Sequence, residues 1–159
     1  MSTITIFGDG NMGTAIAGIA TTGGASVQAI TTATPPATIE GDLVVLAVPY
    51  PALATIAASY GPQLAGKVVV DITNPLDFQT FDALTVPAGS SATAELAELL
   101  PESKVLKAFN TTFAATLATG VTGSLPTTVL VAGDDTEAKQ ALIGVVKAGG
   151  LDALDVGSL

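Results

Sequence analysis

The stretch Gly8-Asp9-Gly10-Asn11-Met12-Gly13 follows a short apolar run, Thr3–Phe7, and precedes a segment whose apolar residues have helical spacing. Gly8 suits a tight turn, Gly10 lets the backbone approach a ligand, and Gly13 lets the helix pack closely on the strand. The N–H groups that begin such a helix bind phosphate. A plain strand-to-helix turn is the alternative, but the flanking elements favour a dinucleotide site. The predicted binding residues of this loop are Gly8, Gly10, Asn11, Met12 and Gly13.

Short runs rich in Val, Ile and Leu recur along the chain, with helical or loop stretches between them. The runs Leu43–Val48 and Val68–Val70 lack alternation, as strands buried on both faces do. We therefore expect an α/β fold of the Rossmann-like, doubly wound type, with a mostly parallel sheet and helices on both faces. The predicted strands are Thr3–Phe7, Ser26–Thr31, Leu43–Val48, Lys67–Ile72, Lys104–Phe109, Thr127–Ala132 and one near Leu154–Val156. The predicted helices are Asn11–Thr22, Ala52–Ser59, Ala92–Leu100 and Thr136–Ala148.

Two helix starts carry candidate capping side chains. Asn11 is expected to act near the N-cap of the first helix, and Asp134 or Asp135 to cap the last one. Between Thr31 and Leu43 there are too few residues for the helix and strand that normally follow the second strand, and Pro35-Pro36 favours a loop. We therefore expect one shortened βα unit within a single dinucleotide-binding domain, residues 1–159.

Composition narrows the classes of partner. The net charge is −9, with 14 acidic and 5 basic residues, which argues against nucleic-acid or anionic-membrane partners. The chain contains no Cys and no His, so we expect no thiol chemistry and no transition-metal site. No apolar run approaches the roughly 20 residues that a membrane span needs, and no signal-peptide pattern is present. We expect a cytoplasmic protein.

The end of the second predicted strand normally selects the cofactor. An acid there binds the ribose 2′-hydroxyl of NAD, whereas a basic residue accommodates the 2′-phosphate of NADP. This chain has neither in the segment Ile30–Thr34. The hydroxyls of Thr31 and Thr32 can bond a phosphate, so NADP is slightly preferred and NAD stays open.

Four segments resemble the deazaflavin-dependent NADP oxidoreductase family and related dinucleotide-binding oxidoreductases, including the reductase domain of the six-transmembrane metalloreductases. They are GDGNMGTAIA at 8–17, AVPYPAL at 47–53, VVDITNPL at 69–76 and KAFNTT at 107–112. The resemblance implies a hydride-exchanging site at the carboxyl edge of the sheet. It places Ala47, Val48, Pro49 and Tyr50 beside the nicotinamide ribose, Thr73, Asn74 and Pro75 at the nicotinamide end, and Asn110 beside a second redox ring.

Plainer interpretations of these loops remain open. Asn74-Pro75 is also a common turn dipeptide, Tyr50-Pro51 can begin a helix, and Asn110 can cap a helix over 113–117. The family's basic residues near the 2′-phosphate have no counterpart around Thr31. The chain also stops at Leu159, directly after the last predicted strand, so we expect a truncated relative.

The residue types present favour one kind of redox chemistry. Carbonyl reduction usually needs a nearby proton donor, and no recognisable donor pair occurs; Lys107 lies in a predicted strand, and the other lysines, Lys139 among them, are expected on the surface. Hydride exchange between NADPH and a flavin or deazaflavin needs mainly orientation, which we assign to Thr73, Asn74 and Asn110.

Two other classes stay open. One is a non-catalytic dinucleotide-binding module, or an engineered or minimised scaffold, that lacks a complete acceptor site. The other is the N-terminal domain of a β-hydroxyacid dehydrogenase or pyrroline-carboxylate reductase relative, whose glycine loop is similar. An unpaired sheet edge makes a homodimer a further expectation.

Overall fold

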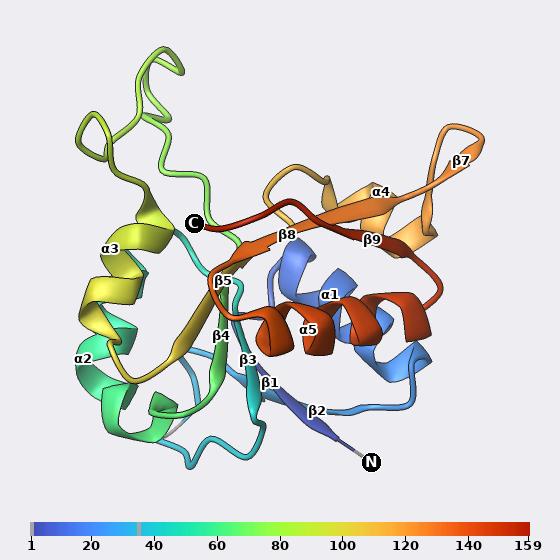
Figure 1. Ribbon diagram of the computed structural model, residues 1–159, viewed down its shortest axis with the longest axis horizontal. Coiled ribbons are helices and arrows are strands. Elements are labelled where there is room, and N and C mark those ends of the chain that lie inside the picture. Colours follow the sequence, from blue (N-terminus) through green and yellow to red (C-terminus); the bar gives the residue numbers. More distant parts are fainter. Residues whose placement is uncertain (1, 35) are drawn as a thin grey trace.

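The computed structural model describes residues 2–34 and 36–159. Met1 lies outside the described residues, and so does Pro35, which belongs to the predicted loop. Seven strands of the described chain form one sheet in the order β2-β1-β3-β4-β5-β8-β9 (Figure 1). All neighbours are parallel except β5 and β8. The strands are β1 (Thr3–Phe7), β2 (Ser26–Ile30), β3 (Leu43–Leu46), β4 (Val68–Asp71), β5 (Lys104–Ala108), β8 (Thr128–Gly133) and β9 (Asp152–Asp155). This arrangement confirms the predicted Rossmann-like α/β fold.

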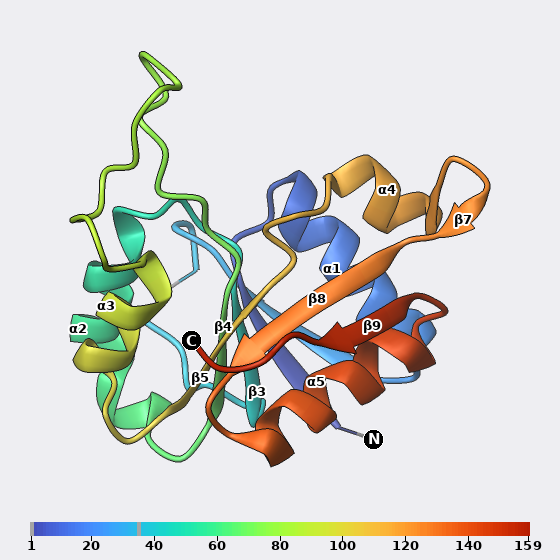
Figure 2. The same cartoon turned by 45° about the horizontal axis from the view of Figure 1, so that its top comes forward.

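Helices cover both faces of the sheet (Figures 1 and 2). One face carries α1 (Asn11–Thr22), α4 (Ala114–Thr119) and α5 (Thr136–Ala148), and the other carries α2 (Ala52–Leu64) and α3 (Ala92–Leu99). The central strand β3 contributes to both cores, because Val45 packs on the α1 side while Val44 and Leu46 pack on the α2 side. The absence of alternation in this strand thus reflects burial on two faces.

The shortened βα unit lies between β2 and β3. Strand β1 pairs with β2 on one side and with β3 on the other, and the described residues 31–34 and 36–42 join them without a helix or strand. Polar bonds hold this connection: the buried Thr5 hydroxyl donates to the Gln28 side chain at 2.7 Å and accepts the Gly41 N–H at 3.0 Å. Ile39 enters the core beside α2. The predicted loop is confirmed.

Several predicted boundaries were wrong. Helix α2 continues past Ser59 to Leu64, although Pro62 lies inside it, because Leu64 is fully buried and Tyr60 packs edge-on against Phe7. A hairpin of β6 (Val121–Thr122) and β7 (Leu125–Pro126) was not predicted, since its exposed two-residue strands leave no apolar run. The last strand begins at Asp152, earlier than expected, because it forms an exposed, polar sheet edge.

Of the two candidate capping residues of the last helix, only one caps it. Asp135 is the N-cap of α5, and its side chain accepts the N–H of Ala138 at 2.8 Å. The Asp134 side chain instead accepts the N–H of Leu159. Lys139 of α5 was expected at the surface and is only 7% exposed, because it pairs with Asp155 of β9 at 2.8 Å. An ion pair thus joins the last helix to the last strand.

Gly149 and Gly144 test the packing of α5. A Cβ at Gly149 would lie 2.4 Å from Ile19 Cγ2 and 2.5 Å from the Ile19 carbonyl oxygen of α1, whereas a Cβ at Gly144 meets nothing within 4 Å. We expect Gly149→Ala to lower the free energy of unfolding by about 1–3 kcal/mol through overpacking. Gly144→Ala should raise it by about 1 kcal/mol through helix propensity. Denaturant melts of both variants measure this, and equal midpoints would contradict the packing.

Candidate functional site

The glycine loop joins β1 to α1 by backbone contacts that leave no space for side chains. Gly8 has φ +99°, and a Cβ there would lie 2.2 Å from the Ala47 carbonyl oxygen; a Cβ at Gly13 would lie 2.3 Å from the Gly8 carbonyl oxygen. Gly10 differs, because a Cβ there meets nothing within 4 Å. Gly8 and Gly13 therefore close the turn, and Gly10 faces open space.

The start of α1 lacks a side-chain cap. The expectation that Asn11 caps this helix was wrong: the extended Gly10 occupies the N-cap position, and no side chain bonds to the first turn. The first-turn N–H groups of a helix need partners from outside the helix. Those of Asn11, Met12 and Gly13 thus have the chemistry of an anion site, aided by the helix dipole.

The turn after β2 lies beside the glycine loop, because the Gly8 N–H donates to the Ile30 carbonyl oxygen at 2.8 Å. The turn is closed by its own hydroxyls: Thr34 Oγ1 accepts the Thr31 N–H at 2.9 Å, and Thr31 Oγ1 accepts the Ala33 N–H at 3.2 Å. Thr32 is exposed at its tip. The predicted Thr31 hydroxyl therefore shapes the turn, and Thr32 is open to a ligand.

The loop after β3 reaches two elements. Ala47 lies against the glycine loop, while Val48 packs toward the core beside α2, Pro49 is exposed and Pro51 is the N-cap of α2. The Tyr50 hydroxyl donates to Glu95 Oε2 of α3 at 2.6 Å. This bond, together with burial and the negative charge of Glu95, raises the pKa of Tyr50 above its ordinary value. Tyr50 thus both precedes a helix, as the plainer interpretation held, and ties the loop to α3.

The loops after β4 and β5 meet through their asparagines. Asn74 Nδ2 donates to the Asn110 carbonyl oxygen at 3.0 Å, and Asn110 Nδ2 donates to Asn74 Oδ1 at 3.5 Å. Phe109, which directly precedes Asn110, is buried and has φ +65°, a strained conformation for a non-glycine residue. The interpretation of Asn110 as a helix cap was wrong, since α4 has Phe113 at its N-cap and no side-chain cap bond. The fold therefore joins two of the predicted site residues.

A buried ion pair lies beneath these loops and was not predicted as part of the site. Asp71 ends β4 with no exposure, and its Oδ2 accepts Lys107 Nζ at 2.9 Å and the Thr93 hydroxyl at 2.8 Å, while its Oδ1 accepts the Thr73 N–H at 2.7 Å. Lys107 also donates to the Thr73 carbonyl oxygen. The sequence carried only part of the signal, because each charge ends or interrupts an apolar run. The register of β4 and β5, which places the two residues opposite each other, comes from the structure.

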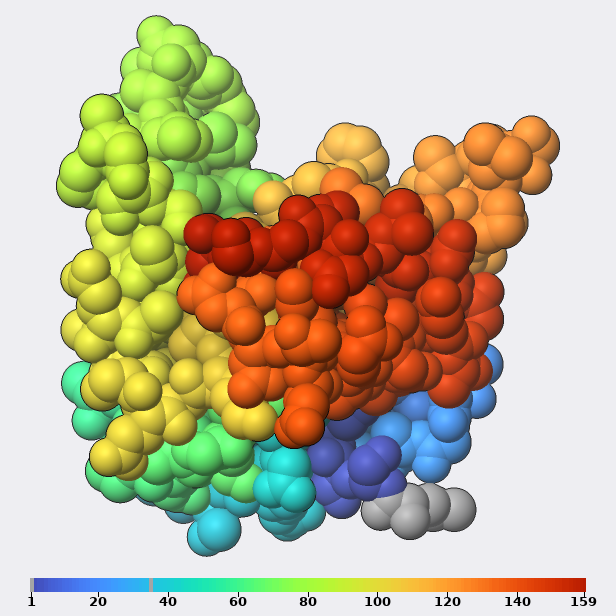
Figure 3. All heavy atoms as spheres, in the orientation of Figure 1, coloured from blue at the N-terminus to red at the C-terminus, as the bar shows by residue number. Residues whose placement is uncertain are grey.

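Thr73 carries an unpaired hydroxyl. The residue is 5% exposed, and its Oγ1 has no hydrogen-bond partner within the described part of the chain. A buried polar atom without a partner costs free energy, so such an atom marks a place where a ligand can complete the bonding. The segment that follows Pro75 projects from the body of the molecule, and Figure 3 shows a notch between that segment (green) and the chain around α4 (gold).

Every lysine side chain has an aspartate nearby. Each of the five lysines lies within ion-pair distance of an aspartate: Lys67 with Asp42, Lys104 with Asp135, Lys107 with Asp71, Lys139 with Asp155 and Lys147 with Asp152. An anionic ligand at the carboxyl edge would therefore depend on N–H and hydroxyl groups.

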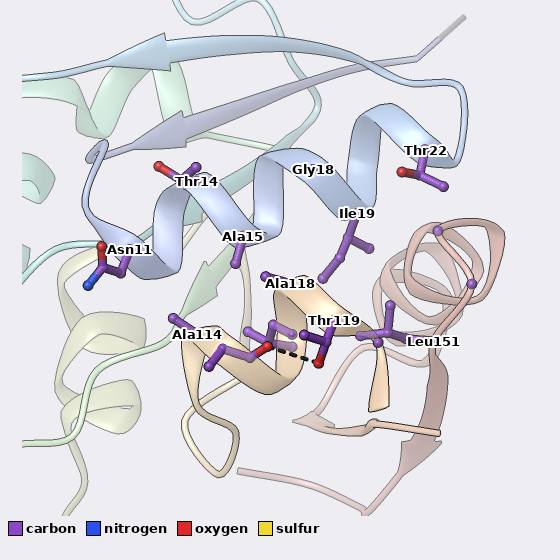
Figure 4. A pocket seen from close by; sticks show the side chains of 15 residues that line it. Asn11, Thr14, Ala15, Gly18, Ile19, Thr22, Ala114, Ala118, Thr119 and Leu151 are labelled. Carbon is purple, nitrogen blue, oxygen red and sulfur yellow. Dashed lines mark hydrogen bonds between the residues drawn. The ribbon is translucent and has the colours of Figure 1, made fainter. Parts of the chain in front are cut away.

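A separate groove of about 680 Å³ lies between α1 and α4 (Figure 4). Small residues line it, including Ala15 and Gly18 of α1 and Ala118 of α4, with Leu151 at one end. Of the predicted site residues, the lining includes Asn11 and no other. The polar groups described above lie at the carboxyl ends of the strands, so we assign the site there. Among the described residues, no helix is long and apolar enough to cross a membrane.

Thr73→Val tests the unpaired hydroxyl. Replacing the hydroxyl by a methyl group removes a buried polar atom without changing the shape, so the free energy of unfolding should rise by about 1 kcal/mol. Thr93→Val is the matched control, because its hydroxyl donates to the Asp71 carboxylate and its loss should cost about 2 kcal/mol. Thermal or denaturant melts give both values. A destabilised Thr73→Val variant would show that this hydroxyl has a partner in the free protein.

The Tyr50–Glu95 bond predicts a pH dependence. Because the pKa of Tyr50 is raised in the folded state, the stability from this bond is fully present below the unfolded-state pKa and is lost as pH rises through the raised value. In a Tyr60→Phe background, which leaves Tyr50 as the sole tyrosine, Glu95→Gln should lower the pH at which tyrosinate absorbance appears. An unchanged titration would contradict the bond.

Known oxidoreductases are similar to this chain in sequence. Residues 25–75 match the family described as NADP oxidoreductase, coenzyme F420-dependent. Over 124 residues the chain is 33% identical to the F420-dependent NADP reductase of Methanocaldococcus jannaschii, which covers 76% of this chain and 55% of that protein. Over 101 residues it is 37% identical to the metalloreductase STEAP3 of Rattus norvegicus, covering 64% of this chain and 20% of that protein.

A solved structure extends the likeness to the whole fold. A protein of Arthrobacter sp. fb24, described as an F420-dependent NADP-reductase, superposes with a TM-score of 0.83 at 27% identity, covering 99% of this chain and 86% of that one. Of the two relatives compared by sequence, the chain spans about half the length of the Methanocaldococcus reductase and a fifth of the rat metalloreductase. The matched segment, these likenesses and the shared fold all relate the chain to the coenzyme F420-dependent NADP oxidoreductase family.

Proposed function

We propose that residues 1–159 act as one dinucleotide-binding domain that transfers a hydride between NADPH and a deazaflavin of the F420 type, or a flavin. The observation that carries the proposal is the uncapped start of α1 under the open space at Gly10. A helix of 12 residues with free first-turn N–H groups suits a pyrophosphate. The names of the relatives add the nicotinamide cofactor and the deazaflavin.

The pyrophosphate would lie on the N–H groups of Asn11, Met12 and Gly13, with Gly8 and Gly13 keeping the loop closed against Ala47. The adenosine ribose would face the turn after β2, where exposed Thr32 offers a hydroxyl. Because the chain places no lysine or arginine in this turn, preference for NADP over NAD would depend on hydroxyl and N–H donors, and we expect it to be modest.

The nicotinamide end would extend toward β3 and β4, past Ala47, Val48, Pro49 and Tyr50, to Thr73, Asn74 and Pro75. Adjacent parallel strands lie about 4.8 Å apart, so the ends of β1 and β5 are separated by three such spacings, roughly 14 Å. This length suits one extended ligand along the edge with a second ring near Asn110.

The residues at that edge would orient rather than transfer protons. When bound, NADPH supplies the hydride, and the acceptor ring receives it. The unpaired Thr73 hydroxyl would bond the nicotinamide end, and the Asn74–Asn110 pair would hold the loops that border the two rings. Such positioning raises the rate by making the encounter effectively intramolecular.

Gly10→Ala tests this site, with Gly18→Ala as a matched control. Both glycines belong to the start or body of α1, and a Cβ at either meets nothing within 4 Å, so both variants should fold like the wild type. The methyl at Gly10 would enter the space assigned to the pyrophosphate, and we expect at least tenfold weaker NADPH binding, about 1.4 kcal/mol, with a parallel loss of F420 reduction. Gly18→Ala should change neither.

Fluorescence titration with NADPH and NADH, followed by F420 and flavin reduction assays, measures these effects. Weakened binding in Gly18→Ala with unchanged Gly10→Ala would place the ligand in the α1–α4 groove and contradict the proposal. Binding without turnover on either acceptor would identify a dinucleotide-binding module instead of an enzyme.

A further inference from the structure

We propose that the buried Lys107–Asp71 ion pair is a positioning device that holds the Thr73–Asn74 loop for the nicotinamide end of the dinucleotide. The inference rests on the proposed function and adds to it two residues, Asp71 and Lys107, that lie within the family segments at 69–76 and 107–112 but received no role from the resemblance. It also states which end of the ligand should lose affinity when these residues are replaced.

The first argument is the cost of the pair. Asp71 is fully buried between the core strands β3 and β5, next to Val69 and Val70, and Lys107 is 19% exposed at its side chain. Removing two charges from water is unfavourable, and apolar residues of similar volume often stabilise a core equally well. The pair therefore needs an explanation beyond the packing of two strands.

The second argument is what the pair holds. The Thr73 N–H donates to Asp71 Oδ1, and the Thr73 carbonyl oxygen accepts from Lys107 Nζ. Both peptide groups that flank Thr73 are thus fixed by charged partners, which make the stronger hydrogen bonds. Because the β-branched side chain of threonine has few rotamers, fixing the backbone also directs the unpaired Oγ1.

The third argument is the reach of the network. The Asp71 carboxylate also accepts the hydroxyl of Thr93 in the first turn of α3, and Glu95 in the same turn accepts the Tyr50 hydroxyl. On the other side, Asn74 donates to the Asn110 carbonyl oxygen. The ion pair thus connects the loops after β3, β4 and β5, which are the three loops assigned to the nicotinamide and acceptor rings, and it touches none of the glycine loop.

This placement predicts a selective effect on ligand binding. Lys107→Met should weaken NADPH binding about tenfold, since one positioned hydrogen bond is worth about that factor. It should change binding of 2′-phospho-ADP-ribose, which has the same phosphates and adenosine but no nicotinamide, by less than about twofold. Lys104→Met is the matched control: it removes the same charge from the same strand, but Lys104 pairs with Asp135 of α5, and neither ligand should respond.

A measurement on the free protein accompanies the titrations. Amide hydrogen exchange of Thr73 should accelerate about tenfold in Lys107→Met, because the loop loses one of its two anchors, and should stay unchanged in Lys104→Met. If Lys107→Met fails to fold because Asp71 is left as a buried, unpaired carboxylate, the Asp71→Asn/Lys107→Met double variant removes that charge and takes the same tests with the same expectations.

The outcomes separate the two proposals. Equal weakening of NADPH and 2′-phospho-ADP-ribose, no weakening of either, or unchanged Thr73 exchange would overturn the positioning role while leaving dinucleotide binding intact. Wild-type protein that binds neither ligand would overturn the proposed function, and the positioning role with it. Selective loss of NADPH affinity together with faster Thr73 exchange would support the role.

Discussion

The backbone contact of Gly8 and Gly13 with each other and with Ala47 is the constraint on which the rest of the structure depends. At either glycine a Cβ would approach a carbonyl oxygen to within 2.3 Å, so the turn from β1 to α1 closes only without side chains. Strand β1 lies between β2 and β3 and sets the register of both. Because the turn also leaves α1 without a side-chain cap, the contact that organises the sheet exposes the N–H groups of the proposed anion site.

The charge distribution fits recognition by backbone groups. The chain carries a net charge of −9, and its five lysines are all paired with aspartates, so little free positive charge is available for a phosphate. A helix N-terminus carries about half an elementary charge, which does not depend on any side chain. The scarce cations serve internal contacts instead, as Lys139 does in fastening β9 to α5 and Lys107 in holding the loop after β4.

A strained backbone and an unpaired polar atom both lie at the carboxyl ends of the strands. Buried Phe109 has a left-handed backbone, which costs about 1–3 kcal/mol for a non-glycine residue and is offset by core burial and by two bonds from Thr112 to the Phe109 carbonyl oxygen. The adjacent Asn110 is thereby turned toward Asn74, and the Thr73 hydroxyl nearby lacks a partner. Features that reduce stability thus lie where the proposed ligand would use them.

The sequence by itself determined the features that depend on neighbours along the chain: the approximate positions of the seven sheet strands, the glycine turn, the short connection after β2 and the burial of β3 on both faces. Spacing, glycine conformation and local hydrophobicity carry this information. Only the tertiary structure decided which distant residues meet. Asp71 and Lys107 are 36 positions apart, as are Asn74 and Asn110, and Lys139 and Asp155 are 16 apart. Their pairing depends on strand register and helix packing, because a lysine in a buried strand looks the same in sequence whether its partner is water or a buried carboxylate.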